Sequence, residues 1–166
     1  MTIRCAPRRD FAGPSRERGI AAVEFVITAP LIIFLLLAGA ELGRAFVHYT
    51  QLSQLVRDAA RYVSEHSING TTGVVSISTT TITRARNLAV YGNIVGTGDA
   101  MLPQYQPSHV QVVNAGGDNI RVDAIYPYQP MLGATLPRFG IGSGSTALNF
   151  TMHIAVTMRA ISSGGS

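Results

Sequence analysis

The apolar residues of this chain gather in one long run near its N-terminus. From Ile20 to Ala40 nearly every residue is apolar, and the one carboxylate in the run is Glu24. About 20 helical residues, each rising about 1.5 Å, cross the roughly 30 Å hydrocarbon core of a bilayer, and this run has 40 − 19 = 21 residues. The pattern therefore predicts a membrane-spanning helix, which Pro30 is expected to kink.

Beyond Ala40 the pattern changes to that of a helix with two faces. Apolar residues now recur at spacings of three and four: Leu42, Ala45, Phe46, Tyr49, Leu52, Val56, Ala59, Ala60 and Val63. Most polar residues are placed on the other side: Arg44, His48, Gln51, Gln54, Arg57 and Arg61. We expect one helix from Ile20 to Ser67, stopped by Asn69-Gly70, which accept a left-handed conformation. Residues 41–68 would form its amphipathic half.

The rest of the chain, residues 69–166, predicts a small globular head. The expected elements are a loop at 70–80 with a short strand possible at 74–77, a helix at 82–91 ended by Gly92-Asn93, a loop at 92–108, a hairpin of strands 110–114 and 119–126, and a long loop at 127–145 rich in Gly and Pro.

The last predicted strand, residues 149–159, has the clearest alternation. Its apolar positions are Phe150, Met152, Ile154, Val156 and Met158, and mostly polar residues stand between them. Three antiparallel strands would then pack on the amphipathic half of the long helix. The predicted fold class is α+β: a long N-terminal helix, membrane-spanning in its first half, packed against a small antiparallel sheet.

The positive charge of the chain lies mostly in its N-terminal tail. Residues 1–18 carry five Arg and two acids, which gives 5 − 2 = +3, and the rest contributes only +1 of the total of +4. Such a tail favours a cytoplasmic N-terminus and a head on the other side of the membrane. The basic balance does not indicate nucleic-acid binding, because no folded face is predicted to be basic. Cys5, the single cysteine, cannot form a disulfide within the chain.

Glu24 is the residue that a plain apolar segment does not explain. A charge deep in a bilayer costs about 2.5–3.5 kcal/mol on insertion scales. One alternative is a secretory signal, with the 10 residues from Leu31 to Ala40 as its apolar core and release after Ala40. Another is an uncleaved single-pass helix that displays a binding domain. Neither alternative gives Glu24 a role.

Cleavage between Gly19 and Ile20 would give Glu24 a role. The carboxylate would then belong to the fifth residue of the mature protein and lie close to a new α-amine. In a low dielectric, an amine and a carboxylate attract strongly, and each reduces the other's cost of burial. Between staggered neighbouring helices this pair can set the register of a filament.

The spacing of Gly19 and Glu24 resembles the type IV prepilin processing motif. A longer pattern resembles the TadE-like family of tight-adherence (Tad, or Flp) pilus assembly proteins. The matching features are Ala21-Ala22-Val23-Glu24-Phe25, Pro30, Glu41-x-x-Arg44 and Ala59-Ala60-Arg61-Tyr62. The resemblance implies that a prepilin peptidase removes residues 1–19. It also implies a minor pseudopilin rather than the main pilin.

The same resemblance implies a location and partners. The chain would lie in the inner membrane with a cytoplasmic N-terminus and a periplasmic head, and it could enter an extracellular pilus. Its partners would be the prepilin peptidase, other pseudopilins and pilins, the inner-membrane assembly platform and membrane lipid. Related TadF and TadG proteins share this N-terminus. The resemblance therefore defines the class of Tad pilus proteins more closely than it defines membership among TadE, TadF and TadG.

No catalytic or metal-binding constellation is predicted. His48, His66, His109 and His153 are scattered and lack the spacing of metal ligands. The glycines of "GIGSGS" (140–145) precede neither a helix nor a basic residue that would seat a phosphate. We therefore expect no enzymatic activity, no cofactor and no metal.

Overall fold

The computed structural model describes residues 17–68, 75–131, 135–137, 145–147 and 149–161. The chain divides into two units between Ala40 and Glu41, and each unit is described by itself. The basic tail, the predicted helix stop at Asn69-Gly70 and the C-terminal residues 162–166 lie outside the described residues. The predicted α+β class, with a long N-terminal helix and a small antiparallel sheet, is confirmed.

Helix α1 (Glu17–His66) contains 50 residues and includes Pro30. It begins three residues before the predicted Ile20 and ends one residue before the predicted Ser67. After the helix, Ile68 and Val75 form an isolated antiparallel bridge. Of the predicted strand at 74–77, residue 74 lies outside the described residues, and residues 76–77 are not in a strand.

Helix α2 (Thr79–Tyr91) is longer than predicted at its N-terminus. The hydroxyl of Ser78 caps it by accepting a hydrogen bond from the backbone N–H of Thr81 at 3.1 Å. The prediction of a loop as far as residue 80 was therefore wrong, because Ser78 was not recognised as a cap. At the other end Gly92 adopts φ 70° and donates its N–H to the Leu88 carbonyl at 3.0 Å. The predicted stop at Gly92 is confirmed.

The main sheet has three antiparallel strands in the order β1-β2-β5. Strand β1 (Val110–Gly116) follows a short 3₁₀ helix, η1 (Pro107–His109), and forms a hairpin with β2 (Asn119–Tyr128). Strand β5 (Phe150–Arg159) pairs with the other side of β2. The predicted hairpin and last strand are confirmed, and both hairpin strands extend beyond their predicted ends.

A second, two-stranded sheet joins β3 (Thr135–Pro137) to β4 (Ser145–Ala147). The prediction of one loop over residues 127–145 was therefore wrong: β2 runs to Tyr128, and β3 and the first residue of β4 lie within that range. Proline and glycine in this region masked strands that are only three residues long.

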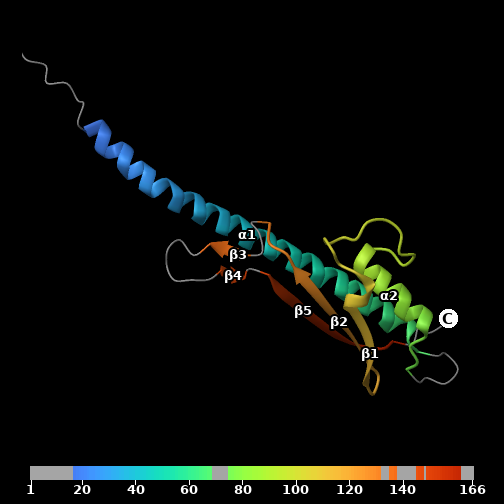
Figure 1. Cartoon of the computed structure of the whole chain (residues 1–166). Coiled ribbons are helices and arrows are strands. Elements are labelled where there is room, and N and C mark those ends of the chain that lie inside the picture. The colour runs from blue at the N-terminus through green and yellow to red at the C-terminus, as the bar shows by residue number, and fades with distance from the viewer. Residues whose placement is uncertain (1–16, 69–74, 132–134, 138–144, 148, 162–166) are drawn as a thin grey trace, which may run out of the picture. The chain divides into compact units, whose positions relative to one another are not determined.

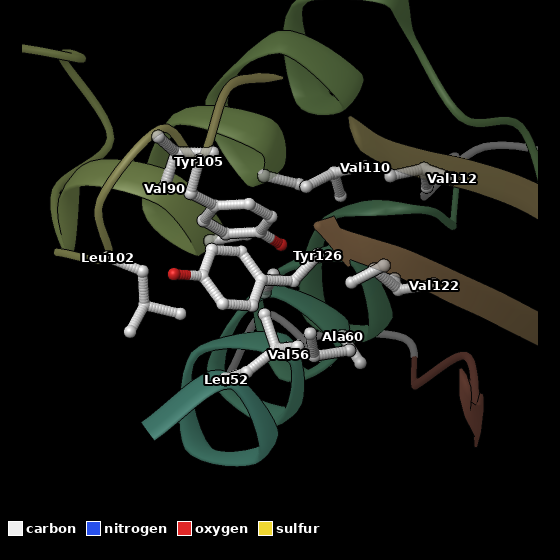
Figure 2. Packing of buried hydrophobic residues seen from close by; sticks show 14 of the residues in the cluster. Leu52, Val56, Ala60, Val90, Leu102, Tyr105, Val110, Val112, Val122 and Tyr126 are labelled. Carbon is white, nitrogen blue, oxygen red and sulfur yellow. The ribbon is translucent and has the colours of Figure 1, made fainter. Parts of the chain in front are cut away.

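The core of the second unit lies between the helices and one face of the main sheet (Figure 1). Side chains from α1, α2 and the strands meet there, and Tyr105 and Tyr126 contact each other edge to face with ring centroids 5.7 Å apart (Figure 2). The largest fully buried side chains are Tyr105, Tyr126, Tyr128, Leu52, Leu102, Ile120, Val56, Val63, Val90, Val110 and Val122. The tyrosines thus supply much of the bulk that closes this core.

The first turns of α1 in the second unit are rotated relative to the prediction. Leu42, Phe46 and Tyr49 were expected to pack, but they are 73%, 70% and 48% exposed. Arg44 and His48, which were expected to face away, are half-buried. The periodicity holds from Leu52 onward, where Val56, Ala59 and Val63 are also fully buried.

Candidate functional site: the apolar helix and Glu41

The first unit consists of an apolar helical segment whose side chains are almost all exposed. Between Gly19 and Ala40 only Ala29 and Phe34 are half-buried, and the others are exposed, with Ile20 at 72% and Phe25 at 68%. Exposed apolar area on this scale indicates a membrane or protein contact. Within the described residues, α1 is the one helix long and apolar enough to cross a membrane. The segment is therefore compatible with a single-pass membrane helix.

The predicted processing site, Gly19-Ile20, lies inside the first turn of α1. A side chain at residue 19 would meet no heavy atom within 4 Å, so the backbone there is open on the side where a Cβ would stand. Cleavage at this bond stays a prediction.

Glu24 lies one turn of helix beyond Ile20, and its side chain is exposed. Its backbone carbonyl accepts a hydrogen bond from the Thr28 hydroxyl at 2.8 Å. Its carboxylate makes no ion pair with any residue that the structure describes. The carboxylate is thus available to a cation from outside the described chain.

Pro30 lies in the middle of the apolar segment, and α1 continues on both sides of it. Because proline has no N–H, the carbonyl of Val26, four residues earlier, loses its usual helical partner. The predicted kink stays a prediction.

Glu41, the first residue of the second unit, joins α1 to the end of strand β2. Its carboxylate accepts a hydrogen bond from the Tyr128 hydroxyl at 2.5 Å. The backbone N–H of Met131 lies 3.2 Å from each of the two carboxylate oxygens and donates to them. Charge-assisted hydrogen bonds of this kind are stronger than neutral ones. Burial, then the hydrogen bond to Glu41 and the charge of Glu41, raise the pKa of Tyr128 to about 12.

His48 lies two turns after Glu41 on the same face of α1. Its Nδ1 lies 3.2 Å from the Tyr126 hydroxyl, and its ring meets Tyr126 and Tyr128 edge-on, with centroids 5.9 and 5.5 Å apart. Burial, and then the positive charge of Arg44, lower the pKa of His48. Glu41 and His48 thus form a polar contact between α1 and two tyrosines of β2.

This contact was not predicted: Glu41 was recognised only as part of a family pattern, and Arg44 and His48 were placed on the polar face of the helix. The spacing of seven residues between Glu41 and His48 was the available signal, because it places both on one helix face. Their packing partners could not be found, since Tyr126 and Tyr128 lie about 80 residues later in the chain.

The opposite face of this part of α1 is apolar and unpartnered among the described residues. Leu42, Phe46 and Tyr49 lie there, next to a shallow groove of about 240 Å³. The groove is lined by Phe46, Tyr49, Thr50, Ser53, Gln54 and Arg57. The second unit therefore has an exposed apolar face of its own on α1.

The other three histidines are held by local contacts or exposed. His66 Nδ1 lies 2.8 Å from the Tyr62 carbonyl, and His109 Nδ1 accepts from the Gln106 N–H at 3.3 Å. His153 is exposed on β5. Within the described ranges, no three His, Cys, Asp or Glu side chains are grouped as metal ligands would be.

Comparison with known proteins finds a family match within helix α1. The family model described as TadE-like protein matches residues 19–61. The resemblance suggested by the motifs is therefore confirmed over this segment, which contains the apolar run, Glu41 and Arg44. No curated protein and no solved structure matches the chain.

Proposed function

Starting from a TadE-like N-terminal helix, we propose that the chain is a minor pseudopilin of a Tad-type adhesive pilus. The family match over residues 19–61 connects the chain with the Tad pilus system and is the observation that carries the proposal. We propose further that a prepilin peptidase cuts between Gly19 and Ile20. The mature protein then stays in the inner membrane, its head in the periplasm, until assembly. Its role is structural, and we propose no enzymatic activity.

Glu24 pairs, in this proposal, with the N-terminal amine of a neighbouring subunit. The support is that its carboxylate is exposed and unpaired among the described residues, within an apolar segment. A carboxylate alone in such surroundings is costly, whereas an amine partner offsets much of that cost. Cleavage after Gly19 creates that amine on each subunit. The pair then fixes the axial stagger between adjacent helices.

The exposed apolar faces of α1 support a role in packing against other helices. In the first unit nearly all side chains are exposed, and in the second unit Leu42, Phe46 and Tyr49 face outward. Lipid covers the first segment before assembly, and helices of other pseudopilins and pilins cover both afterwards. The second unit then presents its head to the assembly platform and to sister subunits.

Substitution of Glu24 tests this proposal in cells that assemble the pilus. We expect Glu24→Gln to lower the sheared pilus fraction by at least about tenfold, because the amine loses its partner. The level of the protein in membranes should stay unchanged. Glu65→Gln is the matched control, since Glu65 lies on the same helix, is exposed and forms an ion pair with Arg61 within that helix. Normal pilus assembly by Glu24→Gln would contradict the assigned role.

A further inference from the structure

The two edge strands of the main sheet, β1 and β5, differ in how well they are protected from pairing with a further strand. The edge formed by β1 carries a register shift between Asn114 and Gly116, and Arg86 of α2 donates its Nε–H to the carbonyl of Val110 at 3.0 Å. Bulges and covering elements of this kind prevent a further strand from adding to a sheet. This edge is therefore protected.

The edge formed by β5 has no such protection among the described residues. All ten residues of Phe150–Arg159 pair with β2 in an unbroken register, and no described strand pairs with their other side. Residues 150–158 include no proline and no Asp, Glu, Lys or Arg. A long, regular and uncharged edge is an open template for another strand.

The hydrogen-bond pattern shows which groups of β5 face the open edge. Ala160 donates its N–H to the Asp118 carbonyl at 2.6 Å, toward the β2 side. Because antiparallel pairing alternates along a strand, even-numbered residues of β5 bond β2 and odd-numbered residues face the edge. Ile161 agrees, since its N–H turns to the Ser64 carbonyl instead, at 3.0 Å. The edge-facing residues are Thr151, His153, Ala155, Thr157 and Arg159.

The core is incompletely covered on the same side. Ile154, Val156 and Met158 of β5 are only half-buried, although the residues opposite them on β2, which are Ala124, Val122 and Ile120, are fully buried. A further strand with apolar residues at alternate positions would cover these three side chains. The edge therefore fits an extended segment whose backbone N–H and C=O groups pair with β5 and whose apolar side chains cover these three residues.

An antiparallel pair of β5 strands from two copies of this chain does not suit the proposed membrane anchoring. Tyr128, which pairs with Phe150, bonds Glu41, and Ile161 bonds Ser64, so α1 runs parallel to β5 through the second unit. In an antiparallel pair of β5 strands, the two Glu41 residues would lie at opposite ends of the joined sheet. Each Glu41 continues directly into the apolar segment, and both segments must enter one membrane. A parallel pair with β1 of another copy meets the protected edge.

We infer that the free edge of β5 binds an extended segment of a different protein, which adds to the main sheet as a fourth strand and covers Ile154, Val156 and Met158. The inference that the partner is a different protein depends on the proposed membrane anchoring. The open edge of β5 is observed in the structure and does not depend on that proposal. The partner segment alternates apolar and polar residues. This gives the head a second contact surface that is independent of α1.

The test is site-specific photo-crosslinking of the full chain in cells. A photoreactive benzoylphenylalanine replaces His153, which is exposed beside the edge, and in a control it replaces Gln111, which is exposed on the protected strand β1. We expect the probe at residue 153 to crosslink one different protein, with the attachment mapped by mass spectrometry to an extended peptide. The probe at residue 111 should give no such product.

Two substitutions that block the edge are combined with the probe at residue 153. Ala155→Pro removes an edge-facing N–H without touching the bonds to β2, and Thr157→Lys adds a charge to an exposed position beside the edge. Each should lower the crosslinked product by at least about tenfold. Ala155→Thr keeps the N–H and should leave the yield within about twofold. If Ala155→Pro does not fold, Thr157→Lys alone tests whether blocking the edge of β5 lowers the yield of the crosslinked product.

A product linking two copies of this chain, no product at residue 153, or an equal yield with Thr157→Lys would overturn the inference. Membrane and soluble fractions are separated in the same experiment. Chain found in the soluble fraction would contradict the proposed anchoring, whereas membrane-bound chain without the product would contradict only the partner of β5.

Discussion

Glu41 and Tyr128 are joined by a hydrogen bond of 2.5 Å between residues 87 positions apart in the sequence. The bond holds the end of β2 against α1 at the first residue of the second unit. Tyr128 is 2% exposed, and its ring also contacts Phe150 of β5 at 5.0 Å between centroids. One carboxylate therefore fixes the relation of the helix to two strands of the head.

Removing either partner of this bond should destabilise the second unit. We expect Glu41→Gln and Tyr128→Phe each to lower the free energy of unfolding by about 1–3 kcal/mol, because Gln removes the charge of the acceptor and Phe removes the donor. The double variant should cost less than the sum of the two, as coupled groups do. Denaturant unfolding of the detergent-solubilised protein measures this. Glu65→Gln, on the exposed face, should cost less than about 0.5 kcal/mol. Equal costs for Glu41→Gln and Glu65→Gln would contradict the assignment.

The raised pKa of Tyr128 predicts a loss of stability in alkali. Burial and the contact with Glu41 raise this pKa from 10.0 to about 12. Because the folded state holds the proton more tightly, the contribution is fully present below pH 10 and is lost as the pH rises to about 12. The measurement is the difference in unfolding free energy between the natural protein and Tyr128→Phe across this range. The difference should shrink with rising pH, and a constant difference would be against the prediction.

The lowered pKa of His48 predicts the opposite dependence in acid. Burial, and then Arg44, lower this pKa below 6.5, while Glu41 opposes the shift. The unfolded chain then binds the proton more readily, so the contribution of neutral His48 is present above pH 6.5 and is lost as the pH falls through the folded-state pKa. Unfolding measured on both sides of pH 6.5 should show a smaller acid loss in His48→Gln. An identical loss in both proteins would exclude His48 as its source.

The rotated face of α1 predicts unequal effects for two leucines of the same helix. Leu52 is fully buried, and Leu52→Ala should lower the free energy of unfolding by about 2–5 kcal/mol through lost burial and a cavity. Leu42 is 73% exposed, and Leu42→Ala should change it by less than about 0.5 kcal/mol. Thermal unfolding of the two variants decides between the structure and the predicted periodicity. Similar losses in both would favour the periodicity.

The long helix, the hairpin and the last strand could be predicted because local patterns determine them. The apolar run predicted the first half of α1, and the alternation of apolar and mostly polar residues predicted β5. The N-terminus of α2 was misplaced because its cap, Ser78, stands among other small polar residues. Strands β3 and β4 were missed because three residues are too few for a pattern to emerge.

The contact around Glu41 could not be predicted, because it depends on tertiary partners. Periodicity assigned Leu42 to the core and His48 to solvent. In the structure, Tyr126 and Tyr128 offer hydroxyls to α1, and hydrogen bonds to Glu41 and His48 favour the polar side of the helix there. A pattern that counts only apolar residues cannot register this preference. The proposed processing site at Gly19-Ile20, by contrast, rests on a local motif and stays a prediction.

The N-terminus of the mature protein tests the central claim most directly. The protein is extracted from isolated membranes, and its N-terminal sequence and intact mass are determined. The account predicts that the chain begins at Ile20, which supplies the amine that Glu24 needs. A chain that begins at Glu41, or one that retains Met1, would contradict prepilin processing and leave Glu24 without its proposed partner.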